Sequence, residues 1–170
     1  MYTPVMIANT IVRNHPGRFD IQQIAKLVQI IQGWGLEGGK SIVCESPVAW
    51  EYGPMHESLY VACRHSGLMT ARQKLDAPIV PPLGTMAPLV PSEDSWTNAL
   101  ISQVITLYGN LTGIQLSSML NRKGTPWHEV YGAFPKLRGK LHGKPISDDV
   151  LMRHYQRLRA DSKIISAHAA

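Results

Sequence analysis

The chain has 170 residues, of which 44% are hydrophobic and 17% charged, a composition typical of a folded globular protein rather than a disordered one. This length is enough for one hydrophobic core and short for two. No apolar run approaches the roughly 20 residues that cross a bilayer, and Met1–Val5 lacks the charged start of a secretory signal. Cys44 and Cys63 are too few for a disulfide framework, so we expect a single-domain cytoplasmic protein with reduced thiols.

The positive charge lies in the last third of the chain. Residues 121–170 hold ten of the 17 Lys and Arg residues and four of the 12 Asp and Glu residues. Such a surface can attract nucleic acid or an acidic protein, or it can be a solvated face without a partner. The possible basic surface comprises Arg122, Lys123, Arg153, Arg157 and Arg159.

Two helices are expected in the first 40 residues. Thr3 followed by Pro4 resembles an N-cap with proline at the first helical position, and His15-Pro16-Gly17 ends this first helix. Asp20 and Gln23 have the spacing of a capping box. The helix that follows is apolar on more than one side, which indicates burial, and it ends in the glycines at 33–39.

The middle of the chain predicts an extended segment, a helix and a connecting arm. Residues 41–50 are expected to be extended, as a short strand or one arm of a hairpin. Pro54 is expected to start a helix that continues to about Ser66. Residues 70–91 contain five prolines, so we expect a proline-rich arm without an internal helix.

Three further helices are expected in the second half. Ser92 is predicted to cap a helix whose inner face carries Trp96, Leu100, Val104 and Leu107. Thr112 and Gln115 form a second capping box. Residues 131–145 are expected to be loop, Ser147 opens the last helix, and residues 166–170 form a frayed tail. The fold class is therefore mainly α: a compact single domain over residues 1–165, with about six helices and a minor extended or β element.

The sequence contains no recognisable catalytic pattern. His56-Glu57 and His128-Glu129 each lack the second histidine, one helical turn later, of a zinc protease. No phosphate-binding loop or nucleophile elbow is present. We therefore expect no enzyme activity, no cofactor and no metal. A helix-turn-helix around Thr112 is disfavoured because its second helix carries no Lys or Arg before Arg122.

Four blocks of the sequence resemble the Panacea-domain family, which includes SocA-like antitoxins and phage-encoded GepA-like proteins. The blocks are Ile7-Ala8-Asn9; Lys26-Leu27 with Gln32-Gly33-Trp34; Ala49-Trp50-Glu51-Tyr52-Gly53-Pro54 with Leu59-Tyr60; and Tyr108-Gly109, Leu116-Ser117 and Thr125-Pro126-Trp127. The resemblance covers about the whole chain. One departure is Leu120-Asn121, where the family usually has Thr-His, which puts the role of that histidine in doubt here.

The resemblance implies an antitoxin that neutralises a cognate toxin by direct protein contact, in the SocA type together with delivery of the toxin to a protease. The toxin is expected to be encoded by the adjacent gene. The residues expected to bind the partner are Trp50, Tyr52, Gly53, Pro54, Asn121, Pro126 and Trp127, together with Ile79, Leu83 and Met86 on the arm. Apolar residues of the arm can instead pack onto their own domain.

Two other functions remain open at this point. The same scaffold can serve as a phage-encoded inhibitor of a host defence system, which gene context would distinguish. Alternatively, the basic last third can belong to a nucleic-acid-binding regulator, whose binding would be sensitive to salt. Neither the target nor the oligomeric state follows from the sequence, and a homo-oligomer is possible.

Overall fold

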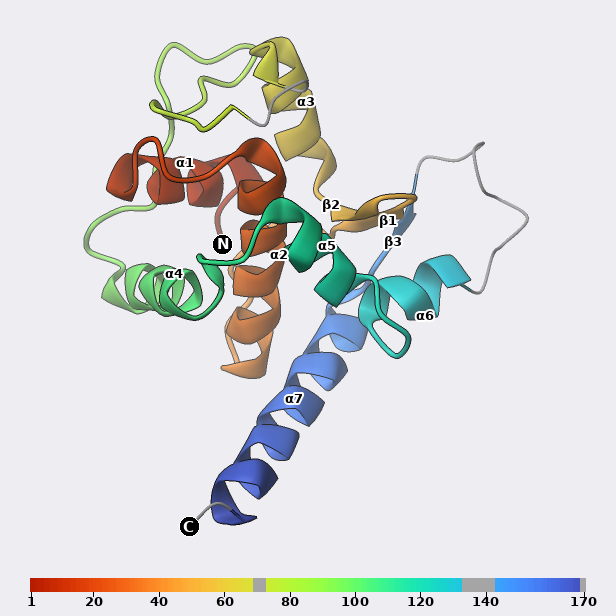
Figure 1. Ribbon diagram of the computed structural model, residues 1–170. Coiled ribbons are helices and arrows are strands. Elements are labelled where there is room, and N and C mark those ends of the chain that lie inside the picture. The colour runs from red at the N-terminus through yellow and green to blue at the C-terminus, as the bar shows by residue number, and fades with distance from the viewer. Residues whose placement is uncertain (69–72, 133–142, 169–170) are drawn as a thin grey trace.

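The computed structural model describes residues 1–68, 73–132 and 143–168, with side chains up to residue 162. This part of the chain is mainly α, as expected, with seven helices and one small sheet (Figure 1). No helix in the same ranges is both long and apolar enough to cross a membrane. The elements are α1 (Pro4–Asn14), α2 (Ile21–Glu37), β1 (Val48–Trp50), β2 (Gly53–Met55), α3 (Glu57–His65), α4 (Ser95–Tyr108), α5 (Gly113–Leu120), α6 (Pro126–Gly132), β3 (Lys144–Pro145) and α7 (Asp148–His168).

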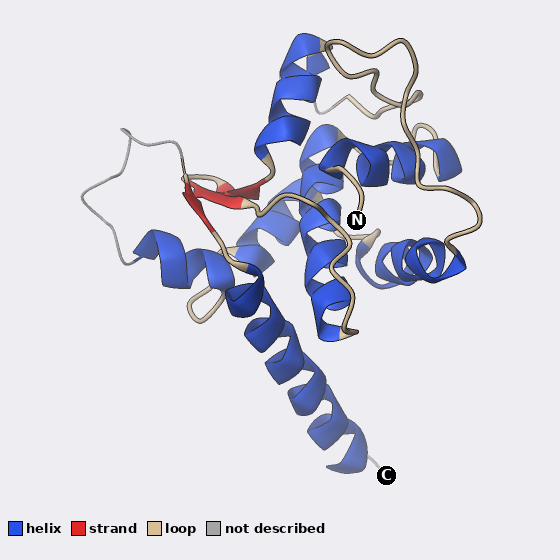
Figure 2. Cartoon of the chain, turned by 180° about the vertical axis from the view of Figure 1, so that it is seen from behind, coloured by secondary structure: helices blue, strands red, loops and turns tan. Residues whose placement is uncertain are grey.

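Helix α2 is the centre of the molecule. It packs against α1, α4, α5, α7 and β2, and these helices lie around it (Figures 1 and 2). Ile24, Leu27 and Ile31 are fully buried, as the broad apolar surface of this segment predicts. The capping box at its start is confirmed, since the Asp20 side chain accepts from the Gln23 amide and the Gln23 side chain accepts from the Asp20 amide.

The sheet is antiparallel with strand order β2-β1-β3. Val48 of β1 pairs with Met55 on one side and Pro145 on the other. Both outer strands contain a proline, which lacks a ladder donor and limits further pairing. The expectation that Pro54 starts a helix is wrong: Pro54 lies in β2, and α3 begins at Glu57.

Three other expectations on helix boundaries are corrected. The helix expected from Ser92 begins at Ser95, with Asp94 as its N-cap. Pro126 opens α6, a helix that was not expected from the sequence and that covers the first two residues of the loop expected at 131–145. Helix α7 continues to His168, so the tail expected from 166 onward begins as helix. Of the loop expected at 131–145, residues 133–142 lie outside the described residues, and Lys144–Pro145 form β3.

Helix α7 docks onto α2 through a glycine. The buried Tyr155 ring occupies the space beside Gly33, where a Cβ atom would lie 2.0 Å from it. Trp34 contacts the same ring edge-on, with 5.0 Å between centroids. An ion pair between Arg159 and Glu37 joins the two helices further along. The close approach of these helices therefore depends on the missing side chain at position 33.

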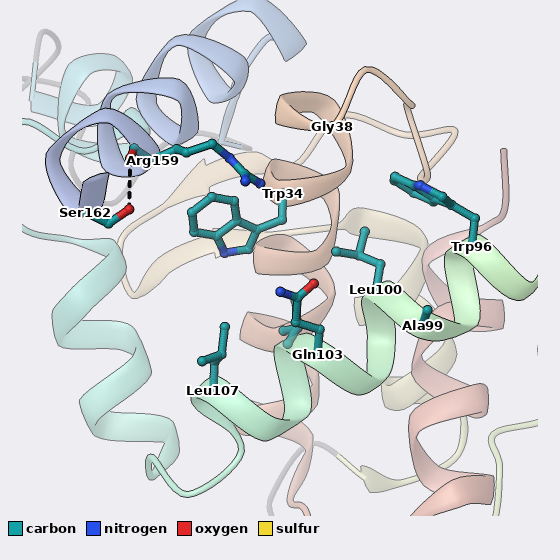
Figure 3. A pocket seen from close by; sticks show the side chains of 10 residues that line it. Trp34, Gly38, Trp96, Ala99, Leu100, Gln103, Leu107, Arg159 and Ser162 are labelled. Carbon is teal, nitrogen blue, oxygen red and sulfur yellow. Dashed lines mark hydrogen bonds between the residues drawn. The ribbon is translucent and has the colours of Figure 1, made fainter. Parts of the chain in front are cut away.

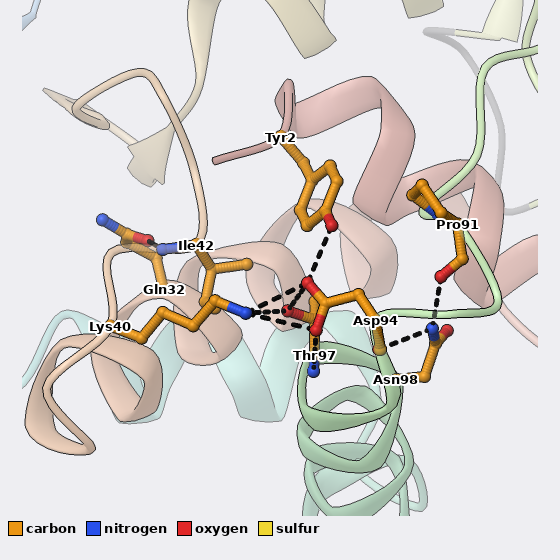
Figure 4. A network of polar contacts seen from close by, with 8 residues as sticks. All are labelled: Tyr2, Gln32, Lys40, Ile42, Pro91, Asp94, Thr97 and Asn98. Carbon is orange, nitrogen blue, oxygen red and sulfur yellow. Dashed lines mark hydrogen bonds and ion pairs between the residues drawn. The ribbon is translucent and has the colours of Figure 1, made fainter.

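The start of α4 is held by a network around Asp94 (Figure 4). Its carboxylate accepts from the Tyr2 hydroxyl at 2.7 Å and from the Thr97 amide at 3.0 Å. Lys40 Nζ lies 3.0 Å from the same carboxylate. One N-cap residue thus connects α4 to the N-terminus and to the segment that follows α2.

Replacing Asp94 by asparagine is expected to lower the free energy of unfolding by about 1 kcal/mol at neutral pH. Hydrogen bonds from Tyr2 and Thr97 hold the pKa of Asp94 below its ordinary value. Because the unfolded carboxyl takes up its proton at higher pH, this contribution is present above about pH 4 and is lost as the pH falls below it. Urea unfolding at several pH values measures the difference in free energy of unfolding between the wild type and Asp94→Asn, and this difference should become smaller in acid. Glu93→Gln, at the exposed neighbouring position, is the control.

Candidate functional site

The β1–β2 hairpin is where several of the sequence blocks that resemble the Panacea-domain family meet. Trp50 pairs with Gly53, so Glu51 and Tyr52 form the turn. Gly53 has a φ of 108°, a conformation that residues with a Cβ atom rarely adopt. Tyr52 is 81% exposed, whereas Gly53 and Pro54 are buried. The hairpin therefore presents one aromatic side chain from a turn whose backbone requires glycine.

A buried lysine stabilises this turn through hydrogen bonds to its backbone. Lys26 extends from α2, and its Nζ donates to the carbonyl oxygens of Pro54 at 2.9 Å and Tyr52 at 3.4 Å. The residue is only 5% exposed, and burial lowers the pKa of Lys26 to about 8. Its amine therefore remains mostly protonated at neutral pH, and the backbone carbonyls of the turn stabilise the charge.

Asn121 closes the other side of the turn. It is the C-cap of α5, and its Oδ1 lies 2.7 Å from the point where a Gly53 Cβ would be, while Lys26 Nζ lies 2.9 Å from the same point. Both polar groups thus fill the space that glycine leaves free. Asn121 Oδ1 has no hydrogen-bond partner among the described residues. The position at which the resemblance expects histidine is therefore part of the hairpin support.

His56 lies directly after β2 and is almost fully buried, at 1% exposure. Within the described part of the chain, neither ring nitrogen has a hydrogen-bond partner. Burial, and then the charge of Lys26, lower the pKa of His56 to about 3. The imidazole is consequently neutral at physiological pH, and protonating it would place a second cation beside Lys26.

Three aromatic residues fix the base of the hairpin. Trp127 Nε1 donates to the Trp50 carbonyl oxygen at 2.6 Å, which joins α6 to β1. The Trp50 ring packs edge-on against Tyr60 of α3, with 4.7 Å between centroids. Pro126, at the start of α6, is buried. The signature residues Trp50, Pro126 and Trp127 are therefore brought together, but as supports of the hairpin more than as an exposed surface.

The chemistry of this cluster is that of a rigid support. Lys26 and Asn121 lie against the turn, and Cys63 of α3 is buried, which raises the pKa of its thiol to about 12. The residues that the structure describes contain no group of three or more His, Cys, Asp or Glu able to hold a metal ion. What the arrangement provides is a turn of fixed shape with Tyr52 at its tip.

The arm residues expected to bind a partner do not behave alike. Leu83 and Met86 are exposed, at 106% and 78% of their surface, and Val80 is 43% exposed. Ile79 is 2% exposed and belongs to the core, so the expectation of a surface anchor is wrong at that position. The difference follows from the contacts with α1, which hold the arm at Ile79 and Val90, whereas Leu83 and Met86 lie in the exposed stretch between them. Residues 70–72 of the arm lie outside the described residues.

The predicted basic surface is only partly free. Arg122 and Lys123 are exposed after α5, and Arg157 is exposed on α7. Arg153 lies 3.5 Å from Glu129, and Arg159 pairs with Glu37. Two of the three arginines on α7 are thus paired with carboxylates, which reduces the number of unpaired arginines on this helix that could contact a phosphate backbone.

A cleft between α2, α4 and α7 was not expected from the sequence (Figure 3). Its volume is about 320 Å³, and it lies between Trp34 of α2, the outward stripe of α4 and Arg159 of α7. Trp96 and Leu107, expected on the inner face of α4, are 42% and 62% exposed. Val104 is buried as expected and Leu100 is partly buried against the core. The rest of the buried face is formed by Thr97, Ile101 and Ile105.

Comparisons with protein-family models, with curated proteins and with solved structures find no match to the chain.

Proposed function

We propose that this chain is an antitoxin-type protein that neutralises a cognate toxin by direct binding, with delivery of the toxin to a protease as a further role. The observation that carries the proposal is the hairpin, which presents Tyr52 from a turn held by Lys26 and Asn121. Support also comes from the resemblance, because its blocks on α2, β1, β2, α3 and α6 contact one another at this hairpin.

An exposed tyrosine on a rigid turn is well suited to protein recognition. Tyrosine contributes a large apolar ring and one hydroxyl at a low cost in conformational entropy, and it is enriched among the residues that dominate binding energy. Because the turn is already fixed in the free chain, little backbone ordering is required when a partner binds. Lys26 and Asn121 thus contribute to binding by fixing the turn that carries Tyr52, without contacting the partner.

The same surface suits a phage-encoded inhibitor of a host defence system, which differs in its target and not in its mode of binding. Gene context separates these two possibilities. A nucleic-acid-binding regulator is less favoured, because two of the three arginines on α7 are paired with carboxylates.

Co-expression with the neighbouring gene is expected to yield a stable complex and to restore growth to cells that the neighbour alone inhibits. Tyr52→Ala should weaken that complex about 30-fold, the size expected for a central interface residue, without changing the unfolding midpoint. Ile114→Ala is the control, since Ile114 is 72% exposed on α5, outside the hairpin. Binding is measured by isothermal titration calorimetry with the purified partner.

A chain that leaves the neighbour toxic and elutes alone would contradict the proposal. Salt-sensitive binding to DNA that is lost in Arg157→Glu would favour the regulator instead.

A further inference from the structure

The segment between α3 and α4 contains a long stretch without charge. Residues 77–92 include no Asp, Glu, Lys, Arg or His, and their nearest charged neighbours along the chain, Asp76 and Glu93, are both acidic. Leu83 and Met86 nevertheless face solvent, with exposures of 106% and 78%. Figure 1 shows this segment as the yellow-green loop beside α1 and α3. Two apolar side chains this exposed on one uncharged loop make the loop a candidate binding surface.

The loop is closed by one buried side chain. The Asn9 amide of α1 donates to the carbonyl oxygens of Ile79 at 2.8 Å and Pro88 at 3.1 Å, and its Oδ1 accepts from the Ile79 amide at 2.6 Å. Asn9 itself is fully buried. Residues 80–87 therefore form an Ω-type loop, called here the Asn9 loop, whose two ends meet at the same side chain.

Further contacts fix the chain on both sides of the Asn9 loop. The Val90 amide donates to Thr10 Oγ1 at 3.0 Å, and both residues are buried. Before the loop, the Leu75 amide donates to the Phe19 carbonyl at 2.9 Å. Inside it, the Gly84 amide donates to the Pro81 carbonyl at 2.9 Å and forms a turn at the tip. Prolines at 81 and 82 limit the backbone further.

We infer that the Asn9 loop is a preformed wedge that inserts Leu83 and Met86 into an apolar pocket of a partner protein. The inference rests on the proposed function, in that it specifies the shape and chemistry of the surface that the bound toxin would offer. It adds a second contact region to the hairpin. Buried polar side chains are costly unless they are hydrogen-bonded, and here two of them, Asn9 and Thr10, bind the backbone of the buried residues Ile79 and Val90, which flank the exposed loop.

The chemistry of the loop favours an apolar protein pocket over other partners. Nucleic-acid binding depends on cations near phosphate, and residues 77–92 carry none. Membrane-inserting loops are commonly flanked by basic residues that bind anionic headgroups, whereas the nearest charged residues here are Asp76 and Glu93, with one lysine, Lys74, further away along the chain. A short, convex loop with two apolar side chains is complementary to a concave pocket, and its fixed conformation reduces the entropy lost on binding.

The preformed state is tested on the free protein by amide hydrogen exchange. The amides of Ile79 and Val90 should exchange at least 100-fold more slowly than in an unstructured chain, and Asn9→Ala should remove this protection at Ile79 while the core of α2 stays protected. Exchange of Ile79 at the unstructured rate in the unmodified chain would overturn the wedge.

The binding role is tested with the complex formed with the neighbouring gene product. The double variant Leu83→Asp, Met86→Asp should weaken binding by 100-fold or more without lowering the unfolding midpoint, and Asn9→Ala by about tenfold. Val61→Asp is the matched control, because Val61 is an apolar residue of α3 that is 53% exposed. Vesicles of phosphatidylcholine and size-exclusion chromatography test for lipid binding and self-association.

The outcomes separate the two proposals. A complex that survives the double variant unchanged overturns the wedge and leaves the proposed function standing. A wild-type chain that binds no neighbour overturns the proposed function and the wedge with it. Binding to vesicles, or self-association, that is lost in the double variant would assign the loop to a lipid surface or to a second copy and overturn the assignment to a partner pocket.

Discussion

Replacing Gly33 by alanine is expected to lower the free energy of unfolding by about 3 kcal/mol and to loosen α7 from α2. The added Cβ would lie 2.0 Å from the Tyr155 ring. Since that ring is buried and also contacts Trp34, it cannot move aside without breaking other packing. Replacing glycine by alanine gains at most about 1 kcal/mol in helical propensity. The steric clash is larger, so the net change in the free energy of unfolding is destabilising.

The measurement is urea unfolding, together with limited proteolysis of α7. Gly132→Ala is the matched control, because the nearest atom to a Cβ at that helical position is 3.6 Å away, and it should be neutral or slightly stabilising. Replacing the ring by a smaller side chain, in the double variant Gly33→Ala, Tyr155→Leu, should make the loss in free energy of unfolding smaller than the sum of the two single losses. A Gly33→Ala chain as stable as the wild type would show that α7 does not depend on this close approach.

Features that depend only on residues close together along the chain were predictable from the sequence. The boxes at Asp20 and Thr112 form as expected, since each links residues three positions apart. Proline at 54 shows the limit of such reasoning: its fixed φ and missing donor suit a helix start and an edge strand equally. Pairing with Ala49 decides between them, and the sequence around Pro54 does not contain that information.

The support of the candidate site could not be predicted for the same reason. Lys26 lies 28 residues from the Pro54 carbonyl that it binds, and Asn9 lies 79 residues from Pro88. A lysine within an apolar helix indicates that its amine is buried and has a polar partner, but the sequence does not identify that partner. Helix α4 was misjudged because it has two apolar stripes, and only the tertiary arrangement determines that Ile101 is buried while Leu107 faces the cleft.

Wild-type protein is expected to lose about 2 kcal/mol of stability between pH 7 and pH 5 because of His56 alone. Burial lowers the pKa of His56 to about 3 in the folded chain, whereas the unfolded side chain titrates near its ordinary value of 6.5. Between these two values the unfolded state binds the extra proton, so stability rises with pH. The contribution is complete above about pH 6.5 and declines as the pH falls toward 3, at about 1.4 kcal/mol per unit.

Urea unfolding of the wild type, His56→Gln and His56→Leu at pH 7, 6 and 5 provides the test. Both variants should lose less stability than the wild type over this range, whatever their stability at pH 7, because neither side chain takes up a proton. His65→Gln, at the exposed last residue of α3, should follow the wild-type slope. Parallel slopes for the wild type and both His56 variants would mean that the imidazole is hydrated in solution. The hairpin above Lys26 would then be open to water, and the rigid presentation of Tyr52 would lose its physical basis.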